Sequence, residues 1–200
     1  SNPFTLRTRG SWRGDTVDLA QIEATAPQLL ALHGNATLTL GATPELALGR
    51  LVIEALEFPA AYTSLMQITL AATDFGDLVT AGRASGTARF AHNALERIDL
   101  QLEHFSTYNE REFFMKDVAG ELHWAAATNA DVSPSWLSWS SGGAYGLSGG
   151  ASRVAFVTRA GSFALSEPWH MPIFDGAIDI RTLAVSGAGT PDMNVRFDAD

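Results

Sequence analysis

The sequence contains no cysteine. Disulfide bridges, thiolate metal sites and cysteine nucleophiles are therefore excluded. Charge is also scarce: 18% of the 200 residues are charged, and only 13 of them are basic against 22 acidic, for a net charge of −9. Nucleic-acid binding needs clustered Lys and Arg to neutralise phosphates, and no dense basic cluster occurs. Nucleic acid is thus not an expected partner.

Long hydrophobic runs are missing too. No segment reaches the roughly 18–20 apolar residues that a membrane-spanning helix needs. The chain begins at "SNPFTLRTRG" without a signal segment and stops at "NVRFDAD" within a strand-like pattern. We therefore expect residues 1–200 to be a single β-rich domain cut from a longer protein, with any membrane anchor outside this sequence.

Short alternations of polar and apolar residues fill most of the chain. The segment "ERIDLQLEHF" (96–105) places Ile98, Leu100 and Leu102 on one face and polar residues on the other. A period of two is that of a β-strand with one apolar and one hydrated face. Similar segments are 15–24, 35–40, 50–58, 119–125, 152–157, 177–185 and 193–197. The pattern predicts a mainly β, largely antiparallel protein, either an open groove or a sandwich.

One segment breaks the alternation. Pro59 stands at a permitted helix start, and Gly76 at the position of a helix end. Between them, the apolar residues at helical spacing are Leu65, Ile68, Ala72 and Phe75. The segment predicts one substantial α-helix over about residues 59–77.

Catalytic motifs are weak throughout. The sequence "GLSGG" (146–150) matches the G-x-S-x-G nucleophile elbow, but a strand-like segment follows where the elbow requires a helix. In "HMPIFDGAIDI" (170–180), Asp175-Gly176 predicts a two-residue hairpin loop with His170 at its entry, instead of an acid–base trio with Asp179. Neither a catalytic residue, a metal ligand nor a cofactor is predicted.

The tryptophans allow two other functions. Aromatic side chains bind sugars or lipid tails, or they plug the end of a β core. A carbohydrate-binding or hydrolysing β domain would place Trp136, Trp139 or Trp169 in a cleft beside paired carboxylates. A structural assembly module would bury all the tryptophans and show only polar faces.

The order of features over residues 55–200 resembles the C-terminal part of YdbH-type proteins, which belong to the AsmA-like group and are relatives of TamB in Gram-negative bacteria. The features are "FPAAYTSLM", "TAGRASGTARF" (80–90), "DVAGELHW" (117–124), "SPSWLSWSSGGAYGLSGG" and "MPIFDGAIDIRTLAV". Residues 1–54 share only the general strand character.

This resemblance implies a non-enzymatic protein that is tethered to the inner membrane and crosses the periplasm as a long, curved β-groove. The implied partners are phospholipid acyl chains on the apolar face, and an outer-membrane lipoprotein that adds a strand to a sheet edge. The helix 59–77 departs from this pattern: it would cap the groove and make this piece a terminal module instead of an open channel segment. Alternation selects nine groove candidates: Ile98, Leu100, Leu102, Leu122, Trp124, Val154, Phe156, Ile178 and Ile180.

Overall fold

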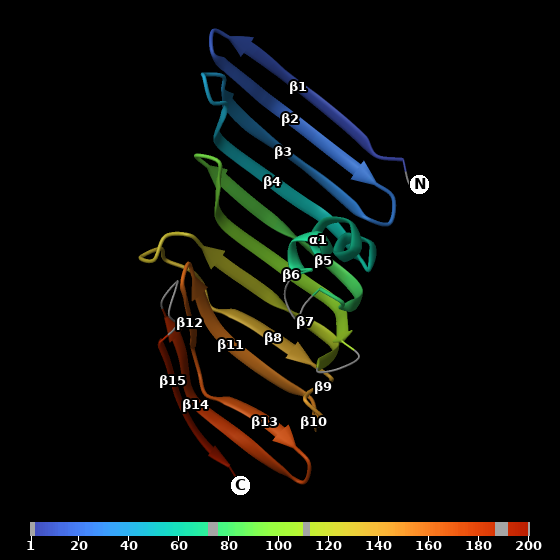
Figure 1. The fold of residues 1–200 in the computed structure, drawn as a ribbon, viewed down its shortest axis with the longest axis vertical. Helices are drawn as coiled ribbons and strands as arrows, with labels where there is room; N and C mark the ends of the chain where they lie inside the picture. Colours follow the sequence, from blue (N-terminus) through green and yellow to red (C-terminus); the bar gives the residue numbers. More distant parts are fainter. Residues whose placement is uncertain (1–2, 72–75, 110–112, 187–191, 200) are drawn as a thin grey trace.

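The computed structural model describes residues 3–71, 76–109, 113–186 and 192–199, which form one 15-stranded sheet (Figure 1). The strand pairs are antiparallel except for a two-residue contact between β7 and β11. The prediction of a mainly β, largely antiparallel fold is therefore confirmed. The described strands make a single layer and not a sandwich of two sheets.

The first seven strands form a meander in which each strand pairs with the next. They are β1 (Thr5–Arg13), β2 (Thr16–Ala26), β3 (Leu30–Thr39), β4 (Glu45–Phe58), β5 (Val79–Ala91), β6 (Ala94–Asn109) and β7 (Phe113–Ala125). Strand β1 is the free edge at the N-terminal end of the sheet (Figure 1).

The meander continues with shorter strands. They are β8 (Ser135–Trp139), β9 (Ser141–Ala144), β10 (Leu147–Gly149), β11 (Ser152–Arg159), β12 (Ser162–Leu165), β13 (Trp169–Ile173), β14 (Gly176–Ser186) and β15 (Asp192–Ala199). Successive short strands act in pairs as the two halves of one longer strand. Strands β8 and β9 both pair with β7, while β10 pairs with β9 and β11 pairs with β8. Likewise, β12 and β13 both pair with β14.

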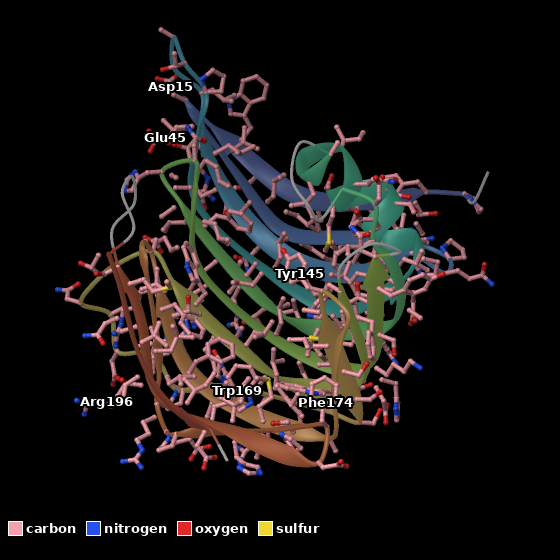
Figure 2. All side chains as sticks on the ribbon, turned by 60° about the horizontal axis from the view of Figure 1, so that its bottom comes forward. Asp15, Glu45, Tyr145, Trp169, Phe174 and Arg196 are labelled. Carbon is pink, nitrogen blue, oxygen red and sulfur yellow. The ribbon has the colours of Figure 1, made fainter. Side chains whose placement is uncertain are left out.

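The breaks between these halves line up across the sheet. They fall at Ser140, at residues 150–151 and at residues 166–168. In the neighbouring strands β6 and β7 the same line continues as β-bulges. His104 of β6 has φ 48°, and Asp117 of β7 has φ 53°. Bulges bend a strand and increase its twist. The sheet curls accordingly, and Figure 2 shows β14 and β15 brought forward in front of the earlier strands.

The cross-strand register separates an apolar face from a polar face, because directly paired residues project to the same side. One row of the apolar face crosses β1 to β7 as Leu6, Ala24, Leu32, Ile53, Gly86, Leu100 and Leu122. The adjacent row on the polar face is Arg7, Glu23, His33, Val52, Thr87, Asp99 and His123.

Much of the apolar face has no covering layer among the described residues, although Thr80, Thr107 and Val118 on this face are buried. The accessible surface is 12500 Å², whereas a compact protein of 21.3 kDa would expose about 9,100 Å². Buried apolar residues are mostly alanines, and the larger ones are Tyr62, Val118, Val132, Val154 and Phe156. Most large apolar side chains therefore remain partly in contact with water.

The predicted helix over 59–77 is wrong. The helical part is a π-helical turn, Tyr62–Met66, followed by a short α1, Gln67–Leu70. Leu65 is exposed and Ile68 is 87% exposed, so their helical spacing has no surface to pack against. Without such burial a helix gains too little to extend. Ala72 and Phe75, on which the prediction also depended, lie outside the described residues.

The short helical segment is held at its start. Ala61 and Tyr62 are buried, and the Tyr62 hydroxyl accepts a hydrogen bond from the Leu78 backbone N–H at 3.3 Å. Within the described ranges, no helical segment has the length and hydrophobicity to cross a membrane.

Candidate functional site

The curl of the sheet encloses a cavity of about 450 Å³. Its larger side chains come from seven strands: Phe113 and Met115 of β7, Leu137 and Trp139 of β8, Leu147 of β10, Val154 and Phe156 of β11, Phe163 and Leu165 of β12, Trp169, Met171 and Ile173 of β13, and Leu183 of β14. None of the described lining residues is charged. Because these are residues of the apolar face, that face lies inside the curl.

Aromatic side chains define the shape of this cavity. The Trp139 and Trp169 rings meet edge to face with centroids 5.8 Å apart, and the Phe156 and Phe163 centroids are 5.1 Å apart. Trp169 lies within the curl in Figure 2. Its Nε1–H donates to Ser152 Oγ at 3.0 Å. The one polar atom of this ring is therefore satisfied by the protein, and its remaining surface is hydrocarbon.

The structure places all nine groove candidates on the apolar face. Ile98 pairs with Trp124, and Leu100 with Leu122. Leu102 pairs with Gly120, which itself pairs with Leu137 of the cavity wall.

The C-terminal candidates lie at the cavity itself. Val154 and Phe156 are buried and line it. Ile178 and Ile180 pair directly with Met171 and Trp169 of the wall. Alternation missed the wall residues of β12 and β13, since "SFAL" and "WHMPI" are too short to display it clearly, and Trp169 was singled out only as an aromatic residue.

Charged residues gather on the polar face. Arg97 donates to both Asp99 carboxylate oxygens, at 2.9 and 3.2 Å, and His123 Nδ1 lies 2.8 Å from Asp99 Oδ1. Partial burial alone would raise the pKa of Asp99, but the hydrogen bonds from Arg97 and His123 outweigh it and hold the pKa below its usual value. The Asp99 hydrogen bond and charge raise the pKa of Arg97.

The histidines all lie beside carboxylates. Besides His123, the pairs are His33–Glu54, His92–Glu45, His104–Asp117 and His170–Asp179, at 2.6 to 3.0 Å. Each pair joins two neighbouring parts of the meander. Within the described ranges, no group of three or more His, Asp or Glu side chains is close enough to hold a metal ion.

The hairpin of residues 170–180 differs in detail from the prediction. Ile173 pairs with Gly176, so the loop residues are Phe174 and Asp175, and Gly176 already belongs to β14. His170 lies within β13, where it pairs directly across the ladder with Asp179. These two residues are a cross-strand pair on the polar face. Ser148 of "GLSGG" likewise lies in β10 of the β9–β10 hairpin.

The tryptophans fit neither alternative function fully. Trp139 and Trp169 line the apolar cavity, which has no carboxylate among its described lining residues. Trp136 and Trp139 line a neighbouring depression of about 430 Å³ with Glu103 and Asp117. Trp12 is 72% exposed, which contradicts the module that buries every tryptophan.

Comparison with protein-family models, with curated proteins and with solved structures finds no match for this chain.

Proposed function

We propose that the apolar face binds phospholipid acyl chains, and that the chain is a non-enzymatic, periplasmic segment of a YdbH-type, AsmA-like protein tethered to the inner membrane. The observation that carries the proposal is the continuous apolar row from β1 to β7, which leads along the same face to the cavity largely without a covering layer of described residues. A sheet normally buries such a face against another element.

An acyl chain fits this face in chemistry and in size. Removing each CH₂ group from water contributes about 0.8 kcal/mol, and the gain accumulates along a continuous surface. A volume of about 450 Å³ lies within the range of small-molecule pockets. The walls lack the convergent charged groups that polar substrates need, so acyl chains are favoured over polar ligands.

Carbohydrate binding is a second candidate, supported by one observation. Trp136 shares its depression on the polar face with Glu103 and Asp117. However, the Arg153 guanidinium lies over the Trp136 ring, 5.1 Å from its centroid, and occupies a surface on which a sugar would stack. We therefore rank this function second. A thermal shift with oligosaccharides that is lost in Trp136→Ala would support it.

Native mass spectrometry of the purified protein, followed by lipid extraction, tests the first proposal. We expect bound phospholipid in the wild type. Leu100→Asp should reduce the bound fraction at least fivefold, because it places a charge in the middle of the apolar row. The matched control is Gln101→Asp, the next residue along β6 and on the opposite face. Absence of lipid from the wild type, or equal loss in both variants, would contradict the proposal.

A further inference from the structure

Two buried hydroxyl groups on the apolar face lack hydrogen-bond partners. Thr80 is 4% exposed and Thr107 is 7% exposed, and neither Oγ1 has a partner among the described residues. The two residues form a directly opposed pair between β5 and β6, so their side chains project side by side. A buried hydroxyl without a partner destabilises a protein, and such groups are rare. Two of them together indicate that something else satisfies them.

The threonine pair lies in line with the apolar cavity. Thr107 pairs with Met115, Met115 with Gly142, and Gly142 with Gly149. The last three residues all line the cavity of 450 Å³. Thr80 and Thr107 themselves line an adjoining cavity of about 720 Å³, and the two cavities share Met115 and Leu147 among other residues. The apolar cavity thus adjoins the cavity that the threonine pair lines.

We propose that Thr80 and Thr107 hydrogen-bond the ester oxygens of a glycerophospholipid whose acyl chain occupies the apolar cavity. The inference rests on the proposed function and adds to it a fixed position for the polar end of the acyl chain. Ester carbonyls accept hydrogen bonds but carry no charge, which suits two neutral hydroxyl donors. Among the described residues, Lys116 is the one charged residue that lines the adjoining cavity beside the threonines, and the apolar cavity has none.

The test compares a diester phospholipid with its diether analogue. Dipalmitoyl phosphatidylcholine and dihexadecyl phosphatidylcholine have the same headgroup and similar chains, but the diether lacks both carbonyl oxygens. Competition between them in native mass spectrometry gives the preference directly. We expect the wild type to bind the diester about tenfold more tightly, the difference made by one or two hydrogen bonds.

Valine substitutions identify the groups responsible. In Thr80→Val/Thr107→Val the preference should disappear, while the affinity for the diether stays unchanged. The same variant should unfold at a higher temperature without lipid, because valine removes the unsatisfied hydroxyls. Thr87→Val is the matched control, since Thr87 lies on the polar face of β5 and pairs with Asp99. It should keep the wild-type preference.

The outcomes separate the two proposals. If the wild type binds diester and diether equally, the threonine site is wrong and acyl-chain binding stands. If it binds neither lipid, the proposed function itself is overturned. A double variant that keeps the tenfold preference also contradicts the threonine site. The comparison of diester and diether binding by the wild type tests the threonine site even if the double variant does not fold.

Discussion

At the scale of single residues, charges hold neighbouring strands together on the polar face. Asp99 has the most of these contacts, since Arg97 on its own strand and His123 on the adjacent β7 both hydrogen-bond its carboxylate. Its side chain is only 29% exposed, so solvent screens these interactions less than at an open surface. Asp99 is therefore the charged residue whose removal should have the clearest effect.

We expect Asp99→Asn to lower the free energy of unfolding by about 1 kcal/mol at pH 7. The pKa of Asp99 is lower in the folded protein, so its ionised form stabilises the fold above about pH 4, the unfolded value. This contribution is lost as the pH falls through the folded pKa. Urea unfolding at pH 7, 5 and 3 should show the wild type and the variant converging at the lowest pH.

Glu103→Gln is the control for this measurement. Glu103 is an exposed residue of the same strand, and its substitution should change stability by less than about 0.5 kcal/mol. A difference between wild type and Asp99→Asn that persists unchanged at pH 3 would contradict the role assigned to the Asp99 carboxylate.

At the scale of elements, the sequence allows the strands to be predicted better than their bends. The alternation of "ERIDLQLEHF" predicts β6 because one face is apolar along its whole length. The bulges that curl the sheet have no such signal. His104 and Asp117 adopt positive φ, which neither residue type requires. The cavity was therefore beyond prediction, although Val154 and Phe156 of its wall were among the candidates.

Two substitutions test which residues stabilise the short helical segment. Tyr62 is 3% exposed and accepts a hydrogen bond from Leu78, whereas Ile68 projects into solvent. Tyr62→Ala should lower the free energy of unfolding by about 3 kcal/mol, and Ile68→Lys should change it by less than about 0.5 kcal/mol. Chemical denaturation measures both. A large loss in Ile68→Lys would mean that this face of the helix is packed in solution.

At the scale of the whole molecule, the defining property is the apolar face, much of which no described layer covers. Small-angle X-ray scattering of the monomer checks this openness, since a compact chain of 200 residues would have a radius of gyration of about 16–17 Å. We expect a larger value. A radius at the compact value would mean that the sheet closes on itself in solution and that the apolar face is not available to ligands.

Unfolding should reveal the same openness. The dependence of unfolding free energy on urea, the m-value, scales with the surface exposed on unfolding. With 12500 Å² already exposed in the native state, the chain gains about 15% less surface than a compact protein of equal mass, so its m-value should be about 15% lower. A saturating phospholipid should raise the urea midpoint by binding only the native state. A full compact-protein m-value without lipid would contradict the open sheet, because the apolar face would then already be buried.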